Sequence, residues 1–565
     1  MIRMFNKTHR FTILAAMLLP LLAINASAQK NSGSANPFSG KVLPKVQLPV
    51  FKKDTINIKR YGAVPDGVTL NTQAINSAIA ACSKKGGGVV VVPTGIWLTG
   101  PIVMQSNVNL HINRDAMLLF TKDYSQYKLV AGNWEGVPAA RNQSPISGKN
   151  LQNIAITGEG IVDGNGDAWR AVKRDKLTDS QWKTLVESGG VLSEDKKMWY
   201  PSEGYYKGSQ VKKAGVLLNG KTVKDFEEIK NFLRPNLVVL ESCKKVLLEG
   251  VTFQNSPAWN LHPLMCEDIT VRNVYAKNPW YAQNGDGIDL ESCKNALIEN
   301  STFDVGDDGI CIKSGRDEEG RKRGKPTENV IIRNCVVYHA HGGFVIGSEM
   351  SGGVHNMYVS NCTFIGTDIG LRFKTTRGRG GVVDQIYISD INMKDIVGDA
   401  ILFDMYYEGK DPVPLKGEQR DAPKVETYKV TEATPQFKDF HVSNVVCNGA
   451  ARAIFVRGLP EMNIADIWLN NMVIQAKTGM DCTEATNINL KNVKLITDNT
   501  NPVISIDNSK SITFDGLKYN AGSELLFNIG GSKTSDIKVS NTSFTNAKNK
   551  ANFVQGASQQ SLITN

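Results

Sequence analysis

Apolar residues alternate with polar or variable residues in short segments along most of this chain, which is the period of a β-strand with one buried face. From residue 153 onward one pattern recurs: asparagine or aspartate, two apolar residues separated by a variable one, another variable residue, and a closing asparagine or glycine. Residues 153–158 and 295–300 are two copies. Successive copies lie from about 21 to about 34 residues apart, with two longer gaps, and this spacing indicates a solenoid.

The residues between the strands indicate which class of solenoid this is. Glycine and asparagine bound the strands and no helical period lies between them, which excludes leucine-rich and helical repeats. A propeller needs four strands per blade and a longer period. The pattern therefore predicts an all-β chain, folded as a single parallel β-helix over residues 51–550.

Other segments depart from the repeat. An amphipathic helix ending near Cys82 is expected to cap the open end of the stack, and residues 551–565 are expected to be a tail. Residues 166–233, with predicted helices at 179–187 and 223–232, and residues 408–434 interrupt the coil. We expect both insertions to be loops standing over the coil, where long ordered loops usually shape sites.

The first residues look like an export signal. Arg3, Lys7 and Arg10 precede an apolar run, and Ala26-Ser-Ala28 is a small-residue cleavage signal, so residues 1–28 are predicted to be removed and residues 29–50 to form a linker. A retained N-terminal anchor is the alternative. The mature chain is then expected in the periplasm or outside the cell.

Charge and cysteines add little more. The full chain carries 65 Lys and Arg against 55 Asp and Glu, a net charge of +10, which suits an anionic partner without identifying one. No arginine-rich tract or nucleic-acid motif is present, so DNA and RNA are poor candidates. The nine cysteines include several at repeat positions and are expected to be buried in the stack, although a disulfide stays open. Nothing indicates a cofactor, and a monomer is expected.

Four strand-like segments of one design lie within residues 284–374. Their alternation predicts that one set of side chains points inside the coil: Ile288, Leu290, Ile310, Ile312, Phe344, Ile346, Leu371 and Phe373. Arg372 and Lys374 then lie in the outward row. Polar residues precede the strands, namely Asn284, Asp286, Asp307, Asp308 and His341. These polar groups therefore line one edge of the stack.

The aspartates can carry acid–base chemistry. Asp286 and Asp308 occupy equivalent places in successive coils, about 4.8 Å apart. Gly306 and Gly309 permit a bend that also turns Asp307 outward. Three carboxylates so close repel, so at least one is expected to hold a proton near neutrality, and glycoside hydrolysis needs one protonated and one ionised carboxyl. Ordinary Asn/Asp turn chemistry and a calcium site are the alternatives.

Taken together, these motifs resemble glycoside hydrolase family 28, the polygalacturonases, whose signatures are N-T-D, D-D, G-H-G and R-I-K. They are found here, in that order, as Asn284-Gly-Asp286, Asp307-Asp308, Ala340-His-Gly342 and Arg372-Phe-Lys374. Gly285, Ala340 and Phe373 depart from the family pattern, while the Asp, His, Arg and Lys positions are kept. The N-terminal segment near Tyr61 also resembles the cap of pectin-degrading right-handed parallel β-helices.

The resemblance implies roles for these residues. Asp308 is expected to be the general acid, and Asp286 and Asp307 to activate water for an inverting attack. His341 is expected to help set the proton of the acid. Arg372 and Lys374 are expected to hold a galacturonate carboxylate. Asn284 is expected to orient the aspartates or the sugar.

Two residues one coil earlier were also candidates. Trp259 and His262 are predicted to form a sugar platform and a polar contact, with a packed turn as the alternative. A pectate lyase would need calcium ligands and an arginine base, and a non-catalytic β-helix would not gather the four motifs. Among relatives of the family, an endo-polygalacturonase and a rhamnogalacturonan or branched-pectin hydrolase are the alternatives.

The long insertions favour attack at chain ends. Residues 166–233 leave the coil one to two turns before Asp286, and residues 408–434 leave it just after Lys374. Loops of this length on both sides are expected to turn an open groove into a pocket that admits only a chain end, unless they fold away from it. The sequences around His341 and Arg372 also look more like exo-acting members of the family.

Overall fold

A computed structural model describes residue 38, residues 40–407 and residues 426–564. The chain divides into two units, residues 1–39 and residues 40–565, and the following description concerns the second. The predicted export signal and most of the 408–434 insertion lie outside the described residues. No helix in the described part of the chain is long and apolar enough to cross a membrane.

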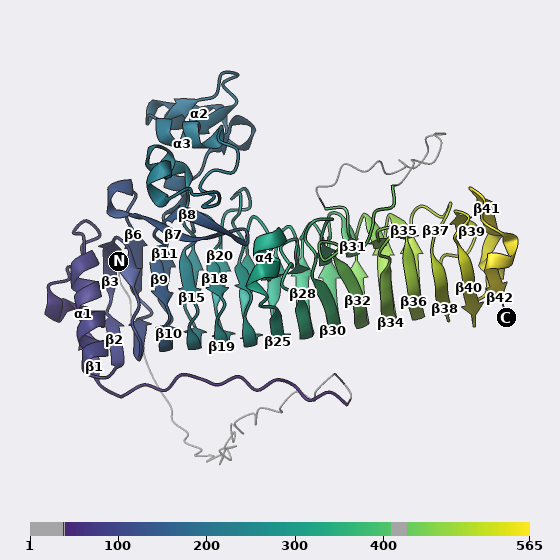
Figure 1. The fold of residues 1–565 in the computed structure, drawn as a ribbon, viewed down its shortest axis with the longest axis horizontal. Helices are drawn as coiled ribbons and strands as arrows, with labels where there is room; N and C mark the ends of the chain where they lie inside the picture. Colours follow the sequence, from purple (N-terminus) through teal and green to yellow (C-terminus); the bar gives the residue numbers. More distant parts are fainter. Residues whose placement is uncertain (1–37, 39, 408–425, 565) are drawn as a thin grey trace, which may run out of the picture. The chain divides into compact units, whose positions relative to one another are not determined.

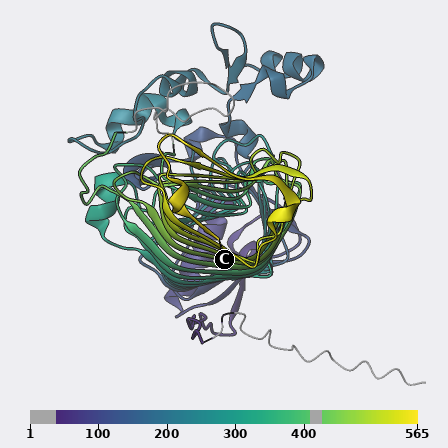
Figure 2. The ribbon, with the colours of Figure 1, turned by 90° about the vertical axis from the view of Figure 1, so that its right-hand side faces the viewer.

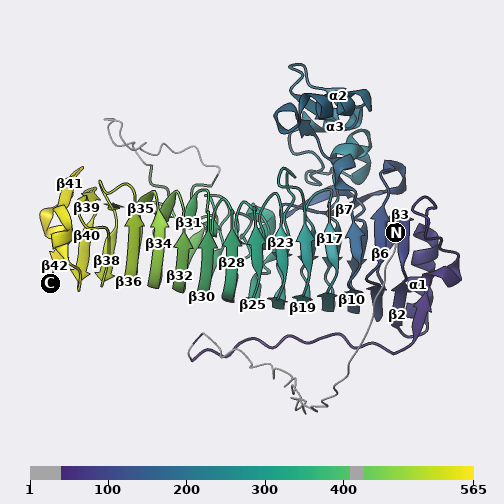
Figure 3. The same ribbon diagram turned by 180° about the vertical axis from the view of Figure 1, so that it is seen from behind.

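The second unit is a right-handed parallel β-helix, as predicted. One sheet has 23 strands and the other has 14, and both run in parallel from turn to turn of the coil (Figures 1 and 3). Viewed along the stack, the successive coils superpose around a filled interior (Figure 2). Several early coils contribute two strands to the larger sheet, such as β16 (Lys244–Glu249) and β17 (Thr252–Gln254), and one to the smaller.

The 14-stranded sheet carries the residues of interest. Its strands are β4 (Ile102–Val103), β9 (Ile146–Lys149), β15 (Val238–Glu241), β18 (Leu261–Leu264), β21 (Ile288–Glu291), β24 (Ile310–Lys313), β27 (Phe344–Ile346), β29 (Leu371–Lys374), β31 (Asp399–Asp404), β33 (Arg452–Arg457), β35 (Thr478–Thr483), β37 (Ile504–Asp507), β39 (Ser523–Gly530) and β41 (Ala547–Val554).

The 23-stranded sheet forms the rest of the wall. Its strands are β1 (Thr55–Asn57), β2 (Gly88–Val92), β3 (Gly95–Thr99), β5 (Val108–Ile112), β6 (Ala116–Phe120), β10 (Gln152–Gly158), β11 (Ile161–Asp163), β16 (Lys244–Glu249), β17 (Thr252–Gln254), β19 (Glu267–Arg272), β20 (Tyr275–Lys277), β22 (Lys294–Glu299), β23 (Thr302–Asp304), β25 (Thr327–Arg333), β26 (Val336–Tyr338), β28 (Val354–Ile365), β30 (Val382–Lys394), β32 (Gln436–Asn448), β34 (Ile464–Ala476), β36 (Ala485–Thr497), β38 (Lys510–Asp515), β40 (Ser535–Ser540) and β42 (Leu562–Thr564).

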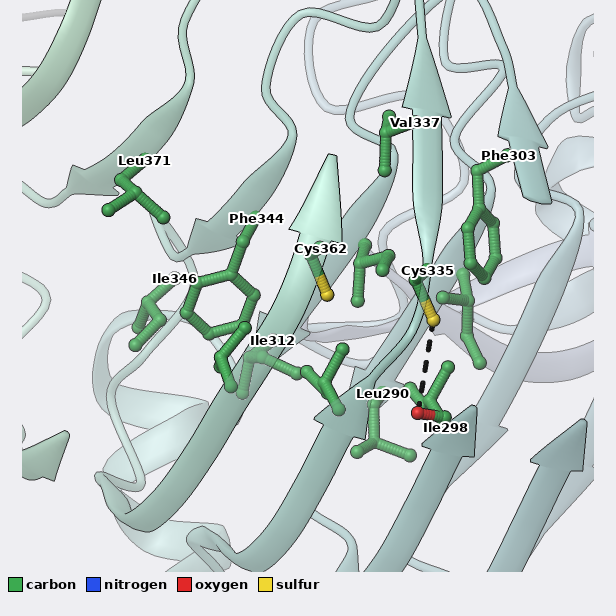
Figure 4. Close-up of a cluster of buried hydrophobic side chains, with 14 of the residues drawn as sticks. Leu290, Ile298, Phe303, Ile312, Cys335, Val337, Phe344, Ile346, Cys362 and Leu371 are labelled. Atoms are coloured by element: carbon green, nitrogen blue, oxygen red, sulfur yellow. Dashed lines mark hydrogen bonds between the residues drawn. The ribbon is translucent and has the colours of Figure 1, made fainter. Parts of the chain in front are cut away.

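The repeat pattern explains the coil. The eight side chains predicted to point inward are all fully buried, and Figure 4 shows several of them packed together with Cys335 and Cys362. The polar residues that open and close each repeat take left-handed backbone conformations, as at Asn295 (φ 56°) and Asn300 (φ 51°). Their side chains bond from rung to rung, with Asn329 Nδ2 donating to Asn295 Oδ1 at 3.1 Å. All nine cysteines are buried free thiols, as the repeat positions predicted.

The ends of the coil differ partly from expectation. Helix α1 (Thr72–Lys84) packs against β2, β4 and β5 as the predicted cap. Residues 40–50, predicted as linker, contact the outside of the coil, since Lys41 Nζ donates to Tyr387 Oη at 2.7 Å. The predicted tail at 551–565 is wrong, because β41 and β42 pair with β39 and β40 and continue both sheets.

The insertion at 166–233 is an ordered body. It contains η3 (Gly166–Trp169), β12 (Val172–Lys173), η4 (Arg174–Lys176), α2 (Asp179–Glu187), β13 (Val191–Leu192), β14 (Met198–Tyr200), α3 (Glu203–Ser209) and η5 (Val223–Phe232). Helix α2 has the predicted bounds, and the segment predicted as a second helix is 3-10. A hairpin that the repeat analysis did not predict, β7 (Leu129–Trp134) and β8 (Val137–Asn142), packs on this body through Ala140 and Leu233. Short helices elsewhere are η1 (Ile58–Tyr61), η2 (Tyr124–Gln126), α4 (Asp317–Arg323), η6 (Phe544–Asn546) and η7 (Gln559–Ser561).

Candidate active site

The turns that lead into β21, β24 and β27 bring the predicted acidic groups together. Gly287 N donates to Asp308 O and His341 N to Asp307 O, both at 2.9 Å, so the turns stack one rung apart. Carboxylate oxygens of Asp286, Asp307 and Asp308 lie within 4.8 Å of one another. This spacing agrees with the prediction that the aspartates of successive coils face each other.

Asp308 is held between two cations. Lys374 Nζ donates to its Oδ2 at 2.8 Å, and Arg372 Nη1 donates to its Oδ1 at 3.1 Å. Burial opposes ionisation, but the Lys374 and Arg372 charges hold the pKa of Asp308 well below its usual range. These contacts oppose the prediction that Asp308 is the general acid, because a general acid must hold a proton.

The same contacts revise the expected clamp for a substrate carboxylate. The Lys374 side chain is 7 % exposed, and its ammonium group is paired with Asp308. Arg372 is 18 % exposed, contacts Asp308 and the His341 carbonyl through Nη1, and has five N–H donors in all. Arg372 is therefore the more exposed of the two cations and has N–H donors left for a second anion.

Asp286 has the opposite environment. It is buried, its Oδ1 has no hydrogen-bond partner among the described residues, and burial, followed by the charge of Asp289, raises its pKa well above the usual value. Asp289 is fully buried on β21 and lies 3.7 Å from Lys313 Nζ. Burial therefore disfavours the charged form of Asp286, whereas two cations favour the charged form of Asp308, so these neighbouring carboxyls have opposite environments.

Asp307 is the most accessible of the three aspartates, with 22 % of its side chain exposed. His341 Nδ1 lies 3.3 Å from its Oδ1, and His341 Nε2 lies 3.7 Å from Asp368. The hydrogen bond to Asp307 raises the pKa of His341 above its usual value. His341 therefore contacts Asp307, and not Asp308, the residue that the resemblance implied to be the acid.

Asn284 is held by a residue that sequence reasoning missed. Arg234 Nη2 donates to Asn284 Oδ1 at 2.8 Å, and its Nη1 donates to the Gln283 and Pro257 carbonyls. Asn284 itself takes a left-handed conformation with φ 52°. Arg234 thus fixes the turn that carries Asp286, and no motif marks this residue because it follows the insertion rather than a repeat.

The predicted sugar platform is wrong. Trp259 and His262 are each 1 % exposed. Trp134 of the hairpin stacks on Trp259 with ring centroids 5.4 Å apart, and His262 Nε2 lies 2.9 Å from the buried Glu291. Both residues are packed parts of the floor, so the alternative of a packed turn is the correct one.

The hairpin covers the outer face of the sheet on the N-terminal side of the aspartates. Arg316, just before α4, pairs with Glu135 at 2.9 Å, and its backbone N–H donates to the Gly136 carbonyl at 3.3 Å. Arg323 of α4 also donates to this carbonyl and to Glu291 of β21. A side chain at Gly136 would come within 2.5 Å of Arg316 N. The hairpin tip is therefore latched to Arg316 and to α4, the segment that follows β24.

The hairpin did carry a sequence signal. Glu135 and Gly136 connect the two strands, and their φ values are 47° and 80°. Two consecutive residues with positive φ are the mark of a tight hairpin turn, and a glycine second in a two-residue turn is typical of it. The repeat search overlooked the segment because it has no copy elsewhere in the chain.

The three carboxylates also have the spacing of a cation site. Asp308 accepts hydrogen bonds from two cationic side chains, and Lys313 lies beside Asp289 and Glu349. Positive charge is therefore already supplied by the chain at this position.

Neighbouring carboxyls with opposite electrostatic environments, beside a third that is accessible, are the kind of groups that glycoside hydrolysis uses. Comparison with known proteins gives the family. The model described as "Glycosyl hydrolases family 28" matches residues 218–432, and "Rhamnogalacturonase A/epimerase, pectate lyase-like" matches residues 55–185.

Solved structures and known sequences that resemble this chain include polygalacturonases. An exopolygalacturonase structure from Thermotoga maritima is 30% identical, covers 80% of this chain and 93% of its own, and superposes with a TM-score of 0.63. An exo-poly-alpha-D-galacturonosidase of Dickeya chrysanthemi is 28% identical over 74% of this chain and 66% of its own length. An endo-polygalacturonase of Pectobacterium carotovorum is 28% identical over 60% and 73%. The chain belongs to glycosyl hydrolase family 28.

Proposed function

We propose that this enzyme hydrolyses α-1,4-linked galacturonic acid in pectin and releases single galacturonic acid residues from chain ends. Family membership supports the reaction, since the relatives are polygalacturonases of both exo and endo type. The observation that carries the exo proposal is the latched hairpin. Trp134 stacks on Trp259, and the next residue, Asn260, donates its backbone N–H to the Asp286 carbonyl at 2.9 Å, so the hairpin packs one rung from the turn that carries Asp286. An endo enzyme needs an open groove there.

The contacts support a different assignment of the catalytic roles to the three aspartates. Asp307, the accessible carboxyl, receives a proton from His341 and passes it to the glycosidic oxygen. Asp308, kept ionised by Lys374 and Arg372, accepts the proton of the attacking water, and Asp286 helps to hold that water. Arg372 binds the carboxylate of a galacturonate beside the scissile bond.

The proposal includes inversion at the anomeric centre, as the family resemblance implies. The closest carboxylate oxygens lie within 4.8 Å, nearer to the spacing of about 5 Å in retaining enzymes than to about 6.5–9.5 Å in inverting ones. The anomer of the first product, followed by proton NMR, therefore tests the stereochemistry separately from the bond that is cut. A β-anomeric product is expected, and an α-anomeric one contradicts inversion.

Viscosity against reducing ends on polygalacturonate tests the exo proposal. We expect galacturonic acid to accumulate while viscosity falls slowly. An early burst of mixed oligomers with collapsing viscosity would indicate the endo alternative. Ultraviolet-absorbing unsaturated products would indicate a lyase, and release of rhamnose-terminated fragments from branched pectin alone would indicate a rhamnogalacturonan hydrolase.

Export of the mature chain as a monomer belongs to the same proposal. A pectic polymer does not enter cells, so its hydrolase must reach the periplasm or the medium. Mass spectrometry of the secreted protein is expected to find an N-terminus near Gln29.

A further inference from the structure

An exposed aromatic pair lies beside the catalytic aspartates. Trp280 is 60 % exposed and Tyr281 is 42 % exposed, in the loop between β20 and Asp286. Their rings meet edge to face, with centroids 5.8 Å apart. Exposed large aromatics add nothing to a core, and such residues on a site rim usually serve binding.

The loop is fixed against the neighbouring catalytic turn. Ala282 N donates to Pro279 O at 2.9 Å, which closes a tight turn around the two rings. A side chain at Gly306 would come within 2.5 Å of the Pro279 carbonyl and 2.8 Å of Ala282 N, so the loop rests directly on this glycine. Gly306 precedes Asp307. The aromatic pair is therefore held at the rim next to the accessible aspartate.

A cation from the insertion reaches the same ring. Lys176, at the end of η4, places Nζ 4.7 Å from the centre of the Trp280 ring. The two residues are about a hundred positions apart in the sequence and belong to different bodies of the fold. An ammonium group over an aromatic face at an exposed place gains little free energy by itself, so stability gives little reason for this pairing.

We propose that Trp280 and Lys176 form a binding subsite for a uronic acid sugar beside the turn that carries Asp307. An indole ring offers a flat apolar face to the C–H groups of a pyranose, and Lys176 offers a positive charge to the sugar's carboxylate. The inference rests on the proposed function and adds two specificity-determining residues from outside the four family motifs. The insertion then recognises substrate as well as flanking the pocket.

Steady-state kinetics on short galacturonate oligosaccharides test the subsite. Trp280→Ala is expected to raise KM about tenfold with kcat within about twofold, because it removes binding without touching the reacting groups. Trp280→Phe keeps a ring and is expected to recover most of the affinity. Lys176→Ala is expected to raise KM about threefold to tenfold on the free acid, and not on the methyl-esterified substrate. Lys183→Ala, an exposed lysine on α2 of the same insertion, is the matched control and is expected to match the wild type.

Tryptophan fluorescence gives a second measurement. In an inactive Asp307→Asn background, galacturonate oligosaccharides are expected to change the emission, and Trp280→Phe is expected to remove most of this change. Unchanged KM in both Trp280→Ala and Lys176→Ala, or an emission change that survives Trp280→Phe, would overturn the subsite. Absence of galacturonate hydrolysis by the wild-type enzyme would instead refute the proposed function.

Discussion

Replacing Lys374 with methionine tests the proposed role of Asp308. The substitution keeps most of the side-chain volume and removes the ammonium that lies 2.8 Å from Asp308. Both side chains are almost fully buried, at 7 % and 2 % exposure. Breaking a buried pair from one side typically costs about 3–5 kcal/mol. Arg372 still contacts Asp308 at 3.1 Å, so we expect a loss near 3 kcal/mol.

The same substitution is expected to move the pH profile. In the wild type the pKa of Asp308 lies below its usual range, so this carboxylate stabilises the fold at pH values above the unfolded pKa, and its contribution is lost as pH falls through the folded pKa. A charged hydrogen bond is worth about 1.5–3 kcal/mol, and one pKa unit corresponds to about 1.36 kcal/mol. Without Lys374 the midpoint of the acid limb of the kcat/KM profile should therefore move to higher pH by about one to two units.

Urea denaturation and a pH series of kcat/KM measure the two effects. Lys394→Met, which breaks an exposed pair with Asp395, is the matched control and is expected to change stability by less than about 0.5 kcal/mol. The double variant with Asp308→Asn should recover part of the stability, because no charge is then left buried alone. An acid limb that stays in place in Lys374→Met would refute an ionised Asp308 as the base.

Three further outcomes are expected. Asp307→Asn should lower kcat on galacturonate oligosaccharides by about 10²–10⁴-fold, and near-normal turnover would exclude it as the acid. The contact with Asp307 raises the pKa of His341, so its stabilising effect is complete below the unfolded pKa and is lost as pH rises through the folded pKa. His341→Gln should therefore flatten the basic limb of the kcat profile. An unchanged basic limb would assign that limb to another group. Dialysis against EDTA should leave activity within about twofold, since Lys374 and Arg372 supply the charge at Asp308, and loss restored by calcium would establish a cation site.

The fold was largely predictable because each copy of the repeat determines its own strand and its own turns. Each copy contains two apolar residues that point inward and polar residues with left-handed backbone conformations at its ends. The burial of Ile310 and the turn at Asn295 therefore follow from the local sequence alone. The chain ends were not predictable in this way. The strand at 562–564 has too few residues to show a period, although its pairing with β40 continues the sheet.

The sequence predicted which residues belong to the site better than it predicted what those residues contact. The motifs located Asp286, Asp308 and Lys374 on neighbouring rungs, but outward alternation does not tell whether a cation faces a ligand or a carboxylate. Trp259 was misassigned because its cover, Trp134, comes from a hairpin more than a hundred residues away in sequence. Such non-local contacts decide burial, and burial decides which side chains can touch a sugar.

We propose that the Trp134–Glu135 hairpin closes one end of the cleft, so that only a chain end can reach the aspartates. Hexagalacturonate labelled at one end, sampled in the first few per cent of reaction, distinguishes a closed from an open cleft. In a closed cleft the label is expected either only on the monomer or only on the pentamer, because every cut removes one terminal sugar. Labelled dimers, trimers or tetramers at these early times would show cleavage inside the chain and contradict a closed pocket.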